Sequence, residues 1–261
     1  MTASSPTILA LDFDGVICDG LIEYFEVAWR TYCQIWSPVD NTPPDDLALR
    51  FYRLRPVIET GWEMPVLIKA LVDKIPEERI LQEWATITPQ ILLDHHLQSQ
   101  TIGAKLDNLR DEWITTDLDG WLSLHRFYPG VLEKIKLTLA SETKLYIVTT
   151  KEGRFVQQLL QREGVNLLRS TIFGKEVKRP KYETLRELIH KAEKKPVSLW
   201  FVEDRIKTLQ LVQQQTDLED VNLFLADWGY NTHTERQTAQ DDHRIQVISL
   251  PQFTKDFTGW H

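Results

Sequence analysis

The stretch Ile8-Leu9-Ala10-Leu11-Asp12-Phe13-Asp14-Gly15-Val16-Ile17 joins an apolar run to two aspartates and a glycine. Four apolar residues closed by a turn residue predict a strand that is buried on both faces. Residues i and i+2 of a strand share a face, so we expect Asp12 and Asp14 to crowd one point at the carboxyl edge of a sheet. Two like charges that close need a cation between them, and Mg²⁺ is the ion we expect.

Length and composition are those of an ordinary globular protein. The 261 residues suffice for one large domain or two small ones, and 42% are hydrophobic. The net charge of −8 argues against a nucleic-acid partner. Cys18 and Cys33 show no metal-ligand spacing or disulfide framework, which fits a reducing cytosol. The first seven residues show no basic region or long apolar run, so we expect no signal peptide, no membrane segment and a cytoplasmic location.

Strand-like and helix-like segments alternate after Pro129-Gly130, which opens a helix to about Ala140. Strands are expected at Lys144–Thr149, near Ser170–Phe173, and at Ser198–Val202, Val221–Ala226 and Ile245–Ser249. Helices are expected at Glu152–Glu163, Lys181–Lys194 and Ile206–Thr216. This alternation predicts an α/β fold with a Rossmann-like, doubly wound parallel sheet that includes the first strand.

The intervening block has a different pattern, with apolar residues at helical spacing and no strand-like alternation. Helices are expected at Leu21–Trp36, Asp45–Leu54, Met64–Ile75, Pro76–Ile87 and Pro89–Trp113, with loops near Gly61, Thr88 and Asp117–Gly120. We therefore predict an α/β core domain of residues 1–18 and 127–261, and an inserted all-helical domain of residues 19–126.

The segment Asp12-Phe13-Asp14-Gly15-Val16 resembles the first motif (DxDGV/T) of the haloacid dehalogenase superfamily of phosphohydrolases. The helical insertion resembles the type 1 cap of that superfamily. The resemblance implies that Asp12 is a nucleophile that forms an aspartyl-phosphate, and that Asp14 is the general acid/base. The tail Asp227-Trp228-Gly229-Tyr230 is similar to a segment of phosphoglycolate-phosphatase-like members.

Two further motifs of the superfamily have candidates downstream. The resemblance places a phosphoryl-binding hydroxyl at Thr149, at the end of a buried strand; its neighbour Thr150 stands where many relatives have Asn. The motif lysine, which neutralises developing charge, is matched best by Lys181, because it follows a proline and starts a helix. Lys178 is the alternative.

The fourth motif is matched by an apolar strand that ends in Glu203-Asp204. The resemblance implies that Asp204 completes the Mg²⁺ site with the Asp12 carboxylate and the Asp14 backbone carbonyl. Many members carry another acid four or five residues on, where this chain has Thr208 and Leu209. Glu203 or a water is then expected to fill that role.

These motifs predict an enzyme, a Mg²⁺-dependent phosphatase that hydrolyses a small phosphorylated metabolite of the phosphoglycolate or sugar phosphate type. A mutase of the β-phosphoglucomutase type is an alternative, because Glu23-Tyr24 resembles it, although Phe25 stands where such mutases have a histidine. A non-catalytic regulatory or binding protein on the same fold is another. We expect a monomer or homodimer.

Two features of the helical block bear on ligands. Arg55 precedes Pro56 and is therefore expected outside a helix, at a loop edge where it reaches an anionic substrate; a solvated arginine is the alternative. His95 and His96 are predicted to be surface residues and not a metal pair, because neighbours on a helix point about 100° apart.

Overall fold

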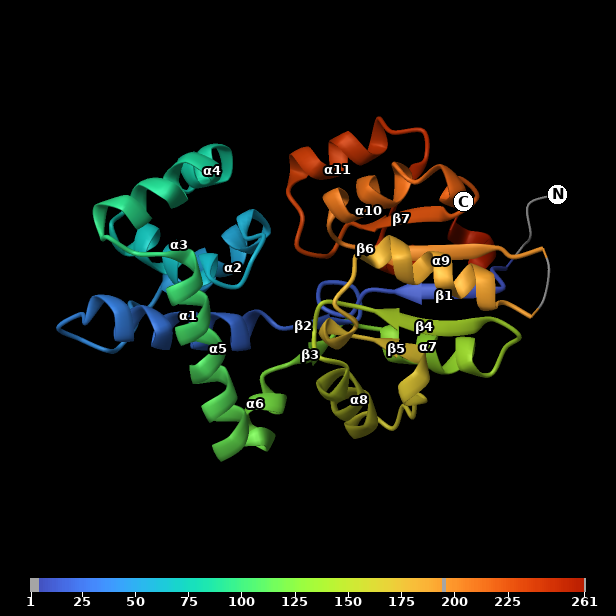
Figure 1. Ribbon diagram of the computed structural model, residues 1–261, viewed down its shortest axis with the longest axis horizontal. Helices are drawn as coiled ribbons and strands as arrows, with labels where there is room; N and C mark the ends of the chain where they lie inside the picture. Colours follow the sequence, from blue (N-terminus) through green and yellow to red (C-terminus); the bar gives the residue numbers. More distant parts are fainter. Residues whose placement is uncertain (1–4, 194–195, 261) are drawn as a thin grey trace. The chain divides into compact units, whose positions relative to one another are not determined.

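The computed structural model describes residues 5–193 and 196–260, in which a six-stranded sheet forms the centre of one compact unit (Figure 1). The strand order is β5-β4-β1-β6-β7-β8, and all neighbours are parallel. The strands are β1 (Ile8–Leu11), β4 (Lys144–Val148), β5 (Ile172–Phe173), β6 (Leu199–Glu203), β7 (Asn222–Ala226) and β8 (Ile245–Ile248). The predicted parallel sheet is thereby confirmed, with β1 at its centre.

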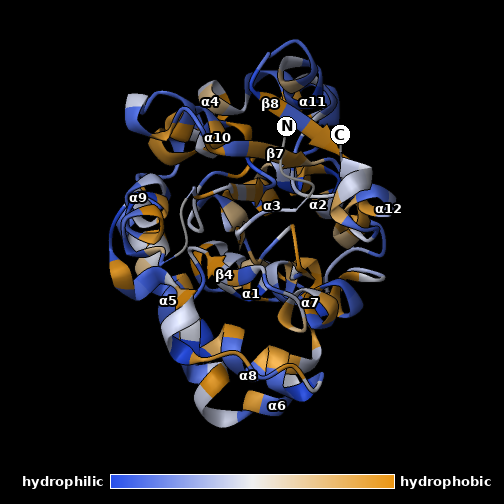
Figure 2. Ribbon diagram, turned by 90° about the vertical axis from the view of Figure 1, so that its right-hand side faces the viewer, coloured by the Kyte–Doolittle hydropathy of each residue, from blue (hydrophilic) through white to orange (hydrophobic). Residues whose placement is uncertain are grey.

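Helices cover both faces of this sheet (Figure 1). One face carries α7 (Val131–Leu139) and α8 (Gly153–Arg162), and the other carries α9 (Lys181–Lys191), α10 (Ile206–Gln213) and α11 (His233–Gln240). Ile8 and Ala10 of β1 pack into the core with α9 and α10. Leu9 and Leu11 are also fully buried, because alternate residues of a strand face opposite sides and both sides are covered. In Figure 2, β8 is mostly hydrophobic and α11 is hydrophilic.

An aromatic cluster fills the core on the α7 side of the sheet. The ring of Trp200 lies 5.2 Å from Phe224 and 5.4 Å from Trp260, and Trp260 lies 5.1 Å from Phe253. Phe253 and Trp260 belong to α12 (Leu250–Phe253) and the 3₁₀ helix η5 (Phe257–Trp260), which the sequence did not predict. Phe253 and Trp260 are therefore part of the core.

The second compact unit, Gly20–His125, is helical. It contains α1 (Leu21–Trp36), α2 (Leu47–Leu54), η1 (Arg55–Val57), α3 (Glu63–Val72), α4 (Glu77–Asp94), α5 (Ser99–Thr116) and α6 (Leu118–Ser123). Its polar centre is Glu23, which is 1% exposed and accepts hydrogen bonds from Arg110 Nε at 2.8 Å and Trp121 Nε1 at 3.0 Å. The other unit comprises the residues up to Asp19 and those from Arg126 onward.

The predicted boundary between two helices at Thr88 is wrong. Helix α4 continues through Pro89 to Asp94, and its backbone leaves helical values at Glu83 instead (φ −121°, ψ 18°). A proline inside a helix removes one hydrogen bond and can be accommodated by a bend. His95 and His96 consequently lie in the loop after α4 and not on a helix, although both are exposed as expected.

Three smaller expectations also differ from the structure. The loop expected at Asp117–Gly120 contains the start of α6, because the Asp117 side chain accepts a hydrogen bond from Gly120 N at 2.9 Å and caps the helix. The antiparallel pair β2 (Cys18–Asp19) and β3 (Arg126–Phe127) was not predicted. Helix α9 ends at Lys191, and the end predicted at Lys194 lies outside the described residues.

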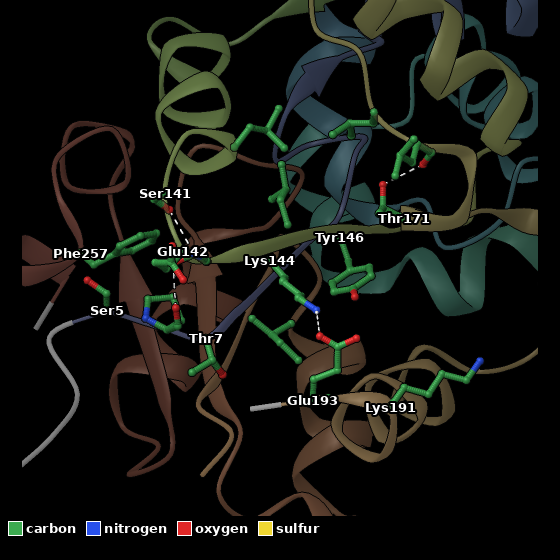
Figure 3. Close-up of a pocket in the computed structure, with 18 of the residues that line it drawn as sticks. Ser5, Thr7, Ser141, Glu142, Lys144, Tyr146, Thr171, Lys191, Glu193 and Phe257 are labelled. Carbon is green, nitrogen blue, oxygen red and sulfur yellow. Dashed lines mark hydrogen bonds and ion pairs between the residues drawn. The ribbon is translucent and has the colours of Figure 1, made fainter. Parts of the chain in front are cut away.

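A cavity of about 730 Å³ lies at the amino ends of β1 and β4 (Figure 3). Lys144 and Glu193 line it and form an ion pair at 3.2 Å. This is the edge of the sheet opposite to Asp12 and Asp14. Within residues 5–193 and 196–260, no helix combines the length and the apolar character that crossing a membrane requires.

Candidate active site

The site is built where β1 and β6 end, side by side, at the carboxyl edge of the sheet. Asp12 follows β1 directly, and its N–H still donates to Val202 O of β6 at 2.9 Å. The chain then turns sharply at Gly15, whose φ is +84°. A side chain is excluded there, because a Cβ on Gly15 would lie 2.1 Å from Asp204 Oδ2.

Lys181 joins two acids that the sequence separates by 191 residues. Its Nζ lies 2.9 Å from Asp12 Oδ1 and 2.7 Å from Glu203 Oε2. Asp12 is 6% exposed and Glu203 is 0% exposed, so this ammonium is held between two buried carboxylates. Lys181 is the first residue of α9, and the preceding Pro180 is the N-cap residue of that helix.

Burial dominates the electrostatics of the acids. Together with the charge of Glu203, it raises the pKa of Asp12 to about 7, although Lys181 opposes the shift. Burial and the charge of Asp12 raise the pKa of Asp204 to about 6. Burial would lower the pKa of Lys181, but the carboxylates of Asp12 and Glu203 outweigh it and raise this pKa above its ordinary value. One ammonium therefore does not compensate for all the acids that surround it.

The acids of the cluster fit a divalent cation. Asp12, Glu203 and Asp204 each offer an oxygen, and these oxygens lie within 4.8 Å of one another. Carboxylate oxygens are the ligands that Mg²⁺ prefers, and a bound cation would favour the charged forms of Asp12 and Asp204, which burial disfavours. Glu203 is the weakest candidate ligand of the three, because its Oε2 already accepts a hydrogen bond from Lys181 and its Oε1 accepts one from Arg205 N at 3.1 Å.

Asp14 has a partner that the sequence did not identify. Lys151 Nζ lies 3.2 Å from Asp14 Oδ1 and 3.4 Å from Oδ2, and the Lys151 side chain is 9% exposed. Lys151 follows β4 by three residues, so it also comes from the carboxyl edge of the sheet. A basic residue just after the end of a predicted central strand is the signal that could have found it.

The remaining candidates of the α/β unit line one small cavity of about 200 Å³ with Lys181. Thr149 is 5% exposed, and its Oγ1 accepts a hydrogen bond from Lys151 N at 3.2 Å. Thr150 is exposed. Lys178 is also exposed and has a φ of +49°, whereas Lys181 contacts Asp12. The structure therefore brings Thr149 beside Lys181 and leaves Lys178 at the surface.

Arg55 belongs to the helical unit. The expectation that it lies outside a helix is wrong, because Arg55 begins η1 with helical dihedral angles (φ −49°, ψ −35°). Its Nη1 donates to Ile58 O at 3.1 Å, and its guanidinium lies 5.1 Å from the centre of the Tyr24 ring. A 3₁₀ turn tolerates the following proline because the ring occupies an N-terminal position of the turn.

Solved structures of other proteins share this architecture. No model of a protein family and no curated sequence matches the chain. A predicted phosphoglycolate phosphatase from Haemophilus somnus aligns over 99% of this chain and 97% of its own, with 15% identity and a TM-score of 0.60. A predicted phosphatase from Clostridium acetobutylicum aligns over 95% and 96%, with 12% identity and a TM-score of 0.57.

A haloacid dehalogenase-like family hydrolase from Streptococcus pneumoniae aligns over 94% of both chains, with 14% identity and a TM-score of 0.55. These alignments cover the α/β unit and the helical unit together. The chain therefore has the fold of the haloacid dehalogenase-like hydrolases, which is the fold that its motifs predicted.

Proposed function

We propose that this chain is a Mg²⁺-dependent phosphatase that hydrolyses a small phosphorylated metabolite through an aspartyl-phosphate. The observation that carries the proposal is the convergence of Asp12, Asp14, Lys181 and Asp204 at one edge of the sheet. Burial, ion pairs and raised pKa values gather there, which is typical of active sites. The fold of the phosphatases described above agrees with this assignment.

In the first step, an Asp12 carboxylate oxygen attacks the phosphorus in line and forms an O–P bond as the bond to the leaving oxygen breaks. Asp14 donates its proton to that leaving oxygen. In the second step, Asp14 takes a proton from water, the water oxygen bonds to phosphorus, and the Asp12–phosphorus bond breaks. Inorganic phosphate leaves, and both carboxyl groups return to their initial states.

The other residues hold charge in place. We assign the Thr149 hydroxyl and the Lys181 ammonium to the phosphoryl oxygens, where they stabilise the charge that develops in the transition state. Glu203 acts on Lys181 rather than on substrate, because it is fully buried and bonded to Lys181 at 2.7 Å. Mg²⁺, held by Asp12, the Asp14 carbonyl and Asp204, would neutralise charge on the transferred group.

The residue at position 25 favours a phosphatase over a phosphomutase. Phe25 is 4% exposed and packs edge to face on Phe51 and Tyr52, with ring centroids 5.7 and 6.1 Å away. A buried phenylalanine offers no proton-transfer group where the mutases have histidine. We propose phosphoglycolate or a sugar phosphate as the substrate class, in line with the name of the Haemophilus somnus protein.

Phosphate release from a panel of small phosphate monoesters tests the proposal, with Mg²⁺ and with EDTA. We expect the wild type to release phosphate only with Mg²⁺, and Asp12→Asn to release none. Asp220→Asn, a change at an exposed acid, is the matched control and should keep full activity. Equal release by the wild type and Asp12→Asn would refute the nucleophile. Metal-dependent ligand binding without any release would favour a regulatory protein.

A further inference from the structure

The loop after β7, residues Asp227–Asn231, forms hydrogen bonds to both the side chain and the backbone of Asp204, the acid that we assign to the metal site. We call this segment the 227–231 loop. The N–H of Tyr230 donates to Asp204 Oδ2 at 2.7 Å, and Asn231 Nδ2 donates to the backbone oxygen of Asp204 at 3.0 Å. Side chain and backbone of Asp204 are thus both fixed by the loop.

The loop is itself anchored at several points. Asn231 Nδ2 also donates to Ala226 O at 2.8 Å, and Asn231 Oδ1 accepts from Arg236 Nη1 at 3.0 Å, so the 4% exposed amide uses both of its ends. Arg205 Nη1 donates to Tyr230 O at 2.5 Å. A buried amide with this many bonds has a single orientation, and it transmits that orientation to Asp204.

The loop also packs against the turn that follows Asp14. Trp228 Nε1 donates to Val16 O at 3.2 Å, and the Tyr230 hydroxyl donates to Asp19 Oδ1 at 3.0 Å. A Cβ on Gly229 would lie 2.3 Å from Asp204 Cβ and 2.6 Å from Gly15 O, so backbone meets backbone here. The two turns that provide Asp14 and Asp204 are therefore held at a fixed separation.

We propose that Asn231 and Tyr230 are positioning residues that preset Asp204 for the metal ion. This inference rests on the proposed function, in which Asp204 is a metal ligand. The loop donates one neutral N–H to Oδ2, which fixes the rotation of the carboxylate without adding a positive charge. Groups that orient metal ligands in this way are worth about 10- to 100-fold in metal affinity.

Mg²⁺ affinity of the full chain, measured by titration calorimetry, tests the inference without reference to turnover. Asn231→Ala should weaken Mg²⁺ binding about tenfold. Thr138→Val is the matched control: its hydroxyl is equally buried and bonded to Lys134 O, and the residue lies in α7. It also removes a buried hydrogen bond but should bind Mg²⁺ as the wild type does. Unchanged Mg²⁺ affinity in Asn231→Ala would overturn the inference.

Arg205→Gln provides a second test in case Asn231→Ala does not fold. The positive charge of Arg205 lowers the pKa of Asp204, so charge alone predicts that its removal tightens Mg²⁺ binding. If Arg205 acts by anchoring the 227–231 loop through Tyr230 O, its removal should instead weaken Mg²⁺ binding several-fold. Tighter Mg²⁺ binding in Arg205→Gln would overturn the inference. Failure of the wild type to bind Mg²⁺ would instead refute the proposed metal site itself, so the two failures are distinguishable.

Discussion

Replacing Lys181 by methionine would leave two buried carboxylates without their shared cation. Lys181 Nζ forms charged hydrogen bonds of 2.9 Å to Asp12 and 2.7 Å to Glu203. Each such bond is worth about 1.5–3 kcal/mol, and breaking a buried ion pair on one side costs about 3–5 kcal/mol. We therefore expect Lys181→Met to lose about 3–5 kcal/mol of unfolding free energy at pH 8 in the absence of Mg²⁺.

The same loss should shrink at low pH. The pKa of Asp12 is already raised to about 7, and that of Glu203 is raised, although Lys181 lowers both. Without Lys181 both pKa values rise further. Above the ordinary carboxyl pKa the folded mutant then binds more protons than its unfolded chain, so its stability falls as pH rises. Lys181 stays charged throughout, so we expect the difference from the wild type to be clearly smaller at pH 5 than at pH 8.

Urea denaturation followed by tryptophan fluorescence measures this difference, with EDTA present at both pH values. Lys144→Met is the matched control, because Lys144 pairs with Glu193 at the surface, where the two side chains are 52% and 82% exposed. Exposed pairs are worth about 0–1 kcal/mol. A loss in Lys181→Met no larger than in Lys144→Met, or an equal loss at pH 5 and pH 8, would refute the reasoning.

Three further changes test other parts of the structure. Asp14→Asn should lower kcat about 10²- to 10⁴-fold, and a loss under tenfold would contradict the proton-transfer role. Gly15→Ala should cost clearly more thermal stability than Gly164→Ala, because both have positive φ but only Gly15 faces Asp204 Oδ2, and equal costs would count against that contact. Burial lowers the pKa of Lys134 to about 8, so above pH 8 the unfolded chain binds a proton that the folded protein has lost. The stability of the wild type should therefore rise between pH 8 and 10 relative to that of Lys134→Met. Urea midpoints that change in parallel over this pH range would exclude this shift.

The sequence predicted the centre of the fold because its signals there agree. The apolar runs at β1 and β6 each end in acids, and their resemblance to two motifs of the haloacid dehalogenase superfamily implies that Asp12 and Asp204 meet, which the parallel pairing of β1 with β6 agrees with. The strands β2 and β3 were missed because each has two residues, which are too few to show a periodic hydrophobic pattern. At Pro89 the local helix-breaking signal was misleading, because α4 continues to Asp94 and buries Ile87, Thr88 and Ile91 around the proline.

Contacts made by long side chains were less predictable. Nothing in periodicity indicates that Lys151 reaches Asp14, because that contact depends on the reach of a lysine across the edge of the sheet. The hydrogen bond from Tyr230 N to Asp204 could not be predicted from residue types, because its donor is a backbone N–H whose position depends on the path of a loop. Residue type and spacing identified the acids, whereas their supporting groups required the coordinates.

The central position of β1 has a consequence for biosynthesis. Ile8 pairs with Lys144 on one side and with Leu199 on the other, so during synthesis β1 must wait for partners that come 136 and 191 residues later. The helical unit is contiguous in sequence and can fold on the ribosome while β1 still lacks both neighbours. Asp12 and Asp204 can meet only after β6 has been synthesised, so the acid cluster assembles late in the synthesis of this unit.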